Sequence, residues 1–427
     1  MKLWQQGEGA LASIEKFTVG DDRIIDLHLA KYDCRASAAH AKMLGKIGLL
    51  QADEVTALVK ALEDLEQIAA EGRFTIEEEF EDVHSKIEFL LIDALGDLGK
   101  KIHTARSRND QVLVALQLYL KDELEVLRNQ TKTLFDILID LADKHKTHLM
   151  PGYTHMQVAM PSSFGLWFSA YAESLIDDLQ FVKSAFQIVD QNPLGSAAGY
   201  GSAFAIDRNF TTEALGFGQL KYNVVNAQMG RGKVEKVTAM ALSMLGGTLA
   251  KMAMDICLFM GQDFNFISFP DELTTGSSIM PHKKNPDVFE LIRGKCNLIQ
   301  ALPNQLTLLA SNLPSGYHRE MQLTKSMLIS GIQTLKECME LFQFCIPQIQ
   351  VRKDLLADQK YDLLFSVDTL EEWVQEGMPF REAYDKMKKM IETGAYTPNR
   401  NVPHTHLGSR GNLALEALTQ KMDSLLW

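Results

Sequence analysis

The sequence of 427 residues lacks the marks of a secreted, nucleic-acid-binding or disulfide-rich protein. Its five cysteines are odd in number, scattered and without a C-x-x-C pair, which argues against a disulfide framework or zinc site and indicates buried thiols in a reducing cytosol. The opening MKLWQQGEGALASIEKF has no uninterrupted apolar run, so we expect no secretory signal. Positive charge is not in excess either, because the net charge is −12, which argues against non-specific binding to nucleic acid.

An uninterrupted hydrophobic run long enough to span a membrane is also missing. The most apolar window, residues 239–261, contains Lys251 and Asp255, and its small residues suit close helix packing, so we expect a buried helix there. Apolar residues make up 46% and charged residues 23% of the chain, as in an ordinary soluble globular protein. The length is sufficient for two or three domains with a large buried core.

Apolar residues recur at helical spacing along most of the chain. Neither glycine nor proline occurs between Ala105 and Met150, which predicts a helix far longer than the mean of about 11–12 residues. Because several of these patterns are apolar nearly all round, the helices must be buried in a bundle or against another subunit. Shorter helices are predicted at 39–50, 52–69 and 81–96, and further long ones at 162–190, 233–261, 286–312 (kinked at Pro303) and 322–346.

The length and charge of the predicted helices change at two places, which divide the chain into three predicted domains. Residues 1–104 form an N-terminal helical domain of short helices joined by polar turns. Residues 105–352 form a central long-helix bundle that carries the polar motifs and the surfaces for oligomerisation. Residues 353–427 return to shorter, more charged helices and form a small C-terminal domain. The predicted fold class is therefore all-α.

The stretch TTGSSIMPHKKNPDVFELIRGK, residues 274–295, concentrates polar groups suited to an anionic substrate. Ser277 follows a leading glycine, and Lys283 adds an ammonium group. Asn285 and Pro286 predict a helix start, with Asn as the capping residue and Pro at the first helical position. A helix N-terminus beside ammonium groups attracts carboxylates. The alternative is a loop whose lysines point into solvent.

Two further polar clusters lie at the ends of predicted long helices. The segment HTARSRNDQV places Ser107, Arg108 and Asn109 before the first long helix, where Arg offers a planar fork for a carboxylate. The segment GYTHMQ places Thr154 and His155 after a Pro-Gly break. The alternatives are a capping or salt-bridge role for the arginine and a structural role for the histidine.

These segments resemble the signatures of the fumarase/aspartase superfamily and, within it, of the argininosuccinate lyase family. GSSIMPHKKNP matches the superfamily loop GSSxMPxKxNP without a gap, HTARSRNDQ is similar to the family's HTGRSRNDQ, and GYTHMQ is similar to GYTHLQ. In GYHREMQLTK, Tyr317, Gln322 and Lys325 fall at the spacing of the family's substrate-binding residues, although a tyrosine alone could be a packed loop aromatic. The resemblance runs from residue 20 to residue 385 and implies a three-domain fumarase/aspartase-type fold.

The resemblance implies a cofactor-free and metal-free β-elimination that converts argininosuccinate into arginine and fumarate in arginine biosynthesis. Ser277 would be the base, and Lys283 would stabilise the aci-carboxylate that forms. His155 paired with Glu290 would supply the proton for the leaving nitrogen. The family's substrate-binding positions would be Asp26, Ser107, Arg108, Asn109, Thr154, Arg231, Asn285, Tyr317, Gln322 and Lys325.

The resemblance also implies a cytoplasmic homotetramer in which each active site takes residues from three chains, with no nucleic-acid or membrane partner. Two departures bear on the substrate. Asp22 stands where the family usually has a serine, and NVVNAQMGRGK (223–233) replaces a segment like NSxDAVSDRD. In that segment Arg231 is kept, while the acidic positions become Asn226, Gly230 and Gly232. A related lyase that releases fumarate from another N-succinyl compound, and a non-catalytic structural protein on the same fold, are the alternatives.

Overall fold

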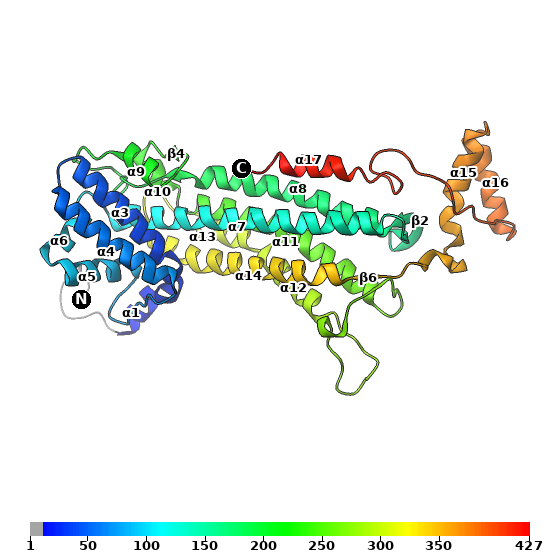
Figure 1. The fold of residues 1–427 in the computed structure, drawn as a ribbon, viewed down its shortest axis with the longest axis horizontal. Helices are drawn as coiled ribbons and strands as arrows, with labels where there is room; N and C mark the ends of the chain where they lie inside the picture. The colour runs from blue at the N-terminus through cyan, green and yellow to red at the C-terminus, as the bar shows by residue number, and fades with distance from the viewer. Residues whose placement is uncertain (1–11) are drawn as a thin grey trace. The chain divides into compact units, whose positions relative to one another are not determined.

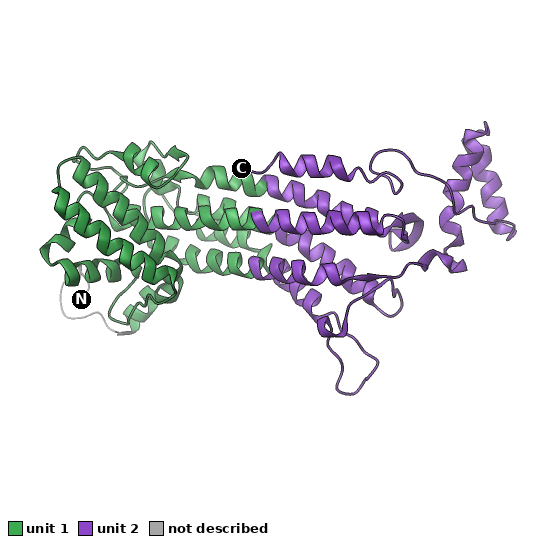
Figure 2. Cartoon of the chain, viewed as in Figure 1, with its two compact units in different colours: residues 1–128, 181–244, 298–335 green, residues 129–180, 245–297, 336–427 purple. Residues whose placement is uncertain are grey.

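The computed structural model describes residues 12–427, which are mostly helical with little strand (Figure 1). The chain divides into two compact units, each built from three separate stretches of sequence (Figure 2). Unit 1 contains the residues up to 128 together with 181–244 and 298–335. Unit 2 contains residues 129–180, 245–297 and 336–427. The domain boundaries expected at residues 104 and 352 stay a prediction.

The predicted long helices are present, and the longest of them has 38 residues. Their bounds are α7 (Arg108–His145), α8 (Phe164–Val189), α11 (Lys233–Met260), α12 (Asp287–Ile299) and α14 (Leu323–Cys345). The helix predicted over 286–312 is broken instead of kinked, because α12 ends at Ile299 and α13 (Leu302–Leu309) begins anew. Pro303 lies in the first turn of α13, where its missing N–H costs nothing.

In unit 1 the short helices predicted near the N-terminus pack around an apolar core. Leu44, Leu58 and Leu62 are fully buried there, and Val83 and Ile87 complete the contact from the next helix. The helices are α1 (Ala12–Val19), α2 (Asp22–Ile25), α3 (Ala30–Lys46), α4 (Ala52–Ala70), α5 (Val83–Leu95), α6 (Asp97–Lys100), α9 (Arg208–Ala214) and α10 (Val224–Met229). Short 3₁₀ turns are η1 (Asp26–Leu29), η2 (Lys101–His103) and η4 (Arg319–Gln322), and β3 (Gln191–Asn192) pairs in parallel with β4 (Gln219–Leu220).

In unit 2 two strand pairs accompany the helices. The strands β1 (Leu149–Thr154) and β2 (Gln157–Ser163) form an antiparallel hairpin, and β5 (Ile267–Ser268) pairs with β6 (Gln350–Val351). Leu370, Ala383 and Met387 form a small separate core between two C-terminal helices. The remaining elements are η3 (Asp271–Leu273), η5 (Ile346–Gln348), η6 (Leu355–Ala357), η7 (Gln359–Phe365), α15 (Ser366–Gln375), α16 (Phe380–Glu392) and α17 (Leu415–Asp423).

Within residues 12–427, α11 is the one helix that is long and apolar enough to cross a membrane by length and composition alone. Half of its most apolar window is buried inside the structure. Leu242, Leu245 and Ile256 on this helix are fully buried among other helices. The core helix of a soluble protein passes the same test of length and composition, so the test alone is weak support for a membrane span.

Candidate active site

The loop that precedes α12 is closed at its base by two backbone hydrogen bonds. Thr275 N–H donates to Asn285 O at 3.2 Å, and Asn285 N–H donates to Thr275 O at 2.8 Å. At its tip the Oγ of Ser277 accepts the backbone N–H of Met280 at 3.2 Å. The amide of Ile279 lies 3.4 Å from the same oxygen. Backbone amides therefore face the hydroxyl that the resemblance identifies as the base.

The prediction that Asn285 caps the following helix is wrong. The helix α12 begins at Asp287, and Pro286 accepts the N–H of Glu290 at 3.0 Å. The side-chain amide of Asn285 instead donates to Thr275 Oγ1 at 3.3 Å and lies 3.4 Å from Gly276 O. The pairing with Thr275 across the loop base turns this side chain away from the helix and toward the loop.

Three of the predicted residues line one cavity of about 710 Å³ in unit 2. Lys283 and Asn285 come from the loop, and Glu290 comes from the first turn of α12. Lys283 is exposed and has no ion pair among residues 12–427, whereas the neighbouring Lys284 is paired with Asp271. The loop therefore presents one uncompensated ammonium group beside an amide and a carboxylate.

Thr154 and His155 lie at the exposed end of the hairpin formed by β1 and β2. Thr154 pairs with Gln157, so His155 and Met156 form a two-residue turn, and their φ angles are +52° and +61°. Two consecutive positive φ angles are typical of a type I′ turn, which Asn and Gly usually occupy. Such backbone strain in non-glycine residues is concentrated at functional sites. In the described chain the imidazole has no hydrogen-bond partner, so its pairing with Glu290 stays a prediction.

In unit 1 the ammonium of Lys325 is buried between two carboxylates. Its Nζ lies 2.6 Å from Asp26 Oδ1 and 3.0 Å from Asp22 Oδ1, and all three side chains are nearly inaccessible. Burial raises the pKa of Asp22 to about 6, and Asp26 adds to this effect against the attraction of Lys325. Burial also acts to lower the pKa of Lys325, but the two carboxylates outweigh it and leave that pKa raised.

The segment that carries Tyr317, Gln322 and Lys325 is anchored to the start of unit 1. The amide of Gln322 donates to the backbone oxygens of Thr18 and Val19, both at 3.0 Å. This contact joins η4 to the turn that precedes Asp22, so residues that are distant in sequence share one region. Tyr317 is half-buried in the loop before η4.

Arg108 lies in the first turn of α7, where it forms an ion pair that the sequence did not reveal. Its Nη1 donates to Asp82 Oδ1 at 2.8 Å. Burial alone would raise the pKa of Asp82, but Arg108, His84 and the hydrogen bonds from Ser85 together outweigh it and lower the pKa to about 2. Asp82 also caps α5 by accepting the N–H of Ser85 at 2.8 Å. An acidic N-cap before an apolar helical run is a recognisable sequence feature, but its pairing with Arg108 is not.

Ser107 and Asn109 begin the same helix, together with a carboxylate that the sequence analysis did not assign. Asp110 Oδ1 accepts the N–H of Ser107 at 3.0 Å, and its Oδ2 accepts the N–H groups of Gly195 and Ala197, both at 2.9 Å. Burial raises the pKa of Asp110 to about 6. This one side chain therefore joins the N-terminus of α7 to the loop that follows β3.

Arg231 is buried next to the start of α11. Its Nε donates to Glu235 Oε1 at 2.7 Å, and its Nη2 donates to Met321 O at 2.7 Å. The guanidinium therefore supports the backbone just before Gln322, and its direct contact with substrate stays a prediction. Within the described residues, no group of three or more His, Cys, Asp or Glu side chains is arranged to hold a metal ion.

Comparison with solved structures shows which fold this is. An EDDS lyase solved with formate aligns with a TM-score of 0.78 at 20% identity, over 98% of this chain and 91% of that one. A fumarate lyase/delta-crystallin protein from Brucella melitensis, solved with cobalt, aligns with a TM-score of 0.74 at 17% identity, over 96% and 93% of the two chains. At such low identity the likeness concerns the fold alone. The fold is that of the fumarase/aspartase superfamily of lyases.

Sequence comparison identifies the family within that class. A model of the lyase family matches residues 13–301. The argininosuccinate lyase of Parabacteroides distasonis is 51% identical over all of this chain and 95% of its own length. That of Thermotoga neapolitana is 40% identical over 90% of this chain and 96% of its own length. The chain therefore belongs to the argininosuccinate lyase family.

Proposed function

We propose that this protein is a carbon–nitrogen lyase that cleaves argininosuccinate into arginine and fumarate. The observation that carries the proposal is 51% identity with an argininosuccinate lyase over the whole length of the chain. The loop that carries Ser277, Lys283 and Asn285 supplies the groups that such an elimination needs. This combination favours an active enzyme over a structural protein on the same fold.

In the reaction a proton leaves a succinyl carbon and the adjacent carbon–nitrogen bond breaks. We assign the first step to Ser277, whose oxygen faces the amides of Ile279 and Met280, because those donors stabilise an alkoxide. The electron pair of the broken C–H bond forms the double bond of fumarate. The electron pair of the carbon–nitrogen bond leaves with the guanidino nitrogen, which takes up a proton and completes arginine.

The negative charge that develops on the succinyl half needs positive charge and hydrogen-bond donors that are already in place. Lys283 and Asn285 line the same cavity and supply an ammonium and an amide. Glu290 lines it as well and is the proposed carboxylate partner of His155. In that pair the carboxylate would orient the imidazole and favour its protonated form, which can donate to the leaving nitrogen.

Substrate binding divides between the two chemically different halves. Asp26 and Lys325, already in contact, would bind the arginine half with Tyr317 and Gln322. Arg108 offers five N–H donors, and Asp82 holds its Nη1 and so fixes the orientation of the fork toward a succinyl carboxylate. Ser107, Asn109 and Thr154 are the remaining residues proposed for the half that becomes fumarate.

The proposed assembly is a cytoplasmic homotetramer with active sites shared between chains. Large apolar side chains on the long helices support oligomerisation, since they are 40–75% exposed in a single chain: Met244, Met254, Leu291 and Leu298. Mixing two inactive variants, Ser277→Ala and Lys325→Met, tests shared sites directly. We expect activity to return after subunit exchange, because some assembled sites receive both wild-type residues. Two variants that stay inactive when mixed, while exchange is shown by native mass spectrometry, would exclude sharing.

The substrate is tested by following fumarate release by ultraviolet absorbance with argininosuccinate, adenylosuccinate, malate and aspartate in parallel. We expect turnover of argininosuccinate alone, lost in Ser277→Ala and kept in the matched control Ser278→Ala. Removal of a catalytic nucleophile or base typically lowers kcat by about 10³-fold or more. Turnover of another substrate, or a Ser277→Ala variant as active as the control, would overturn the substrate or the assignment of the base, respectively.

A further inference from the structure

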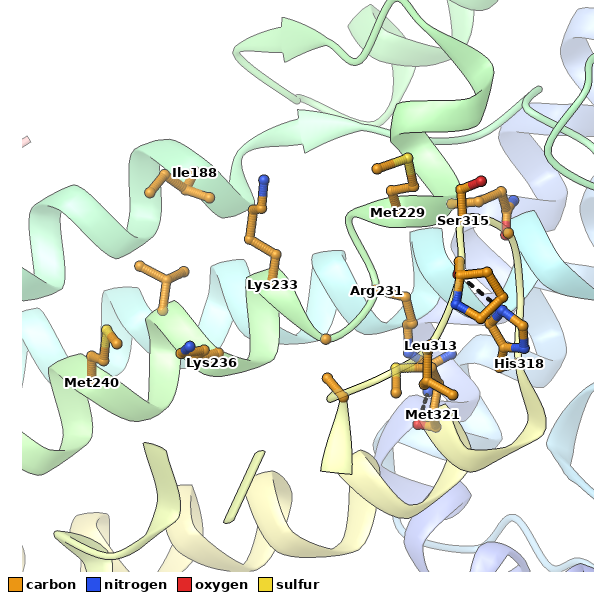
Figure 3. A pocket seen from close by; sticks show the side chains of 16 residues that line it. Ile188, Met229, Arg231, Lys233, Lys236, Met240, Leu313, Ser315, His318 and Met321 are labelled. Carbon is orange, nitrogen blue, oxygen red and sulfur yellow. Dashed lines mark hydrogen bonds between the residues drawn. The ribbon is translucent and has the colours of Figure 1, made fainter. Parts of the chain in front are cut away.

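A cavity of about 530 Å³ in unit 1 carries two lysines, Lys233 and Lys236, that have no role in the proposed elimination (Figure 3). It is bounded by the end of α8, by α10, by the first turns of α11 and by the segment that precedes η4. A volume of this size accommodates a small organic molecule. Its polar side chains are Gln228, Arg231, Lys233, Lys236, Ser315 and His318.

The cavity wall carries two lysines, Lys233 and Lys236, that form no ion pair within the described residues. Lys233 and Lys236 extend from the start of α11, and Arg231 directly precedes it (Figure 3). Among the described residues that line the cavity, none is acidic. Arg231 itself is compensated by Glu235, whose two oxygens accept from Arg231 Nε and from the N–H of Gly232. In a chain with a net charge of −12, such a local excess of cations favours an anionic ligand.

Two buried polar atoms in the cavity wall have no partner within residues 12–427. One is Nη1 of Arg231, whose side chain is 2% exposed, and the other is Oε1 of Gln228, a residue that is 1% exposed. An unpaired buried donor or acceptor costs about 1–3 kcal/mol. Folded proteins rarely leave such groups unsatisfied, so a ligand or an ordered water completes them.

Departures from the family's sequence pattern lie beside this cavity. Gly230 and Gly232 stand where that pattern has acidic residues. A Cβ at Gly230 would lie 3.0 Å from Nζ of Lys221, and a Cβ at Gly232, where φ is +81°, would lie 3.3 Å from Met321 Sδ. Lys221 is 7% exposed and forms no hydrogen bond or salt bridge through its ammonium within the described chain. The segment beside the cavity therefore lacks two carboxylates of the family's pattern, and the one missing at Gly230 would have stood next to Lys221.

We propose that this cavity binds an organic anion, with its charged group on Lys233 and Lys236 and its apolar part against Ile188 and Met240. Charge-assisted hydrogen bonds to ammonium groups suit either a carboxylate or a phosphate. The inference goes beyond the elimination reaction and holds whichever N-succinyl compound is the substrate. Figure 3 shows the apolar residues beside the lysines on the same side of the cavity.

The test uses two probes that share an apolar ring and differ in the charged group, benzoate and phenyl phosphate. Each is titrated into the full-length protein by calorimetry, first without fumarate and then with saturating fumarate, which occupies the elimination site. The double variant Lys233→Met/Lys236→Met removes both charges and keeps the apolar stems. Lys251→Met is the matched control, since Lys251 is an exposed lysine further along α11.

We expect at least one probe to bind wild type and Lys251→Met equally, and the double variant at least about tenfold more weakly, since each charge-assisted bond contributes about 1.5–3 kcal/mol. Wild type that binds neither probe, or a folded double variant that binds like wild type, would overturn the inference. Binding that fumarate abolishes would assign the probe to the elimination site and overturn it as well.

Discussion

Replacing Asp22 with Asn tests the balance of charge around the buried Lys325. Asn keeps an oxygen that can accept from the ammonium and removes one of the two carboxylates that flank it. Asp22 is 8% exposed, and its burial is the main reason why its pKa is raised to about 6. We therefore expect the variant to be more stable than wild type at neutral pH and no more stable in acid.

The sign follows from proton linkage. An aspartate in the unfolded chain has a pKa of about 3.9, so between pH of about 4 and 6 the folded protein holds a proton that the unfolded chain has lost. Stability due to Asp22 is therefore present below pH of about 4 and is lost as the pH rises through 6. A shift of about two pKa units corresponds to about 3 kcal/mol, which is the largest gain expected for the variant above pH 6.

The assay measures thermal unfolding of wild type and variant between pH 4.5 and 8 under the same buffer and ionic strength. Lys325, Arg319 and Asp82 keep their charges over this range, because the pKa values of the two cations are raised and that of Asp82 is about 2. Taking the difference between the two proteins removes the contributions of all other groups. A melting-temperature difference that is the same at both ends of the pH range would refute this account of Asp22.

Three further changes probe other parts of the structure. Asp110→Ala removes the acceptor of three backbone N–H groups and should cost about 3 kcal/mol, seen as a lower melting temperature; an unchanged value would contradict the role given to it. Met156→Gly releases a residue at φ +61° and should raise the melting temperature by the equivalent of about 0.5–1 kcal/mol, so a decrease would argue against strain there. Leu298→Glu, at a position 75% exposed in one chain, should reduce the oligomer mass measured by light scattering, whereas Leu407→Glu in a C-terminal loop should not.

The helices could be predicted from the sequence because their apolar periodicity is long and uninterrupted. The hairpin of β1 and β2 could not, because its turn residues are His155 and Met156 instead of the Asn-Gly pair that normally marks a type I′ turn. The helix start at Asn285 was also wrong, since a backbone pairing with Thr275, ten residues away, decides the direction of that side chain. Sequence rules for helix starts consider only residues that are neighbours in the chain, so they do not account for a backbone pairing between residues ten positions apart.

The residues of the candidate site could be predicted from the sequence only where they resemble a known family. The family resemblance implied that Asp26 and Lys325 bind substrate, and the structure places them in contact. It did not reveal that Asp22 shares the same ammonium or that Asp82 holds Arg108, because each pair joins residues far apart in the chain. Charged residues in such a pair do not alter the spacing of apolar residues around them. The apolar periodicity of the sequence therefore cannot predict which charged residues form ion pairs.

The distribution of paired charges matches the two halves of the proposed substrate. In unit 1 the ammonium of Lys325 is outnumbered by two carboxylates, and such a cluster favours the cationic groups of an arginine half. In unit 2, Lys283 has no ion pair among the described residues, and it lines a cavity with Asn285. That arrangement favours the carboxylates of a succinyl half. A protein with a net charge of −12 can thus bind a dianionic half by leaving one lysine unpaired on a loop, while two buried carboxylates surround the ammonium of Lys325.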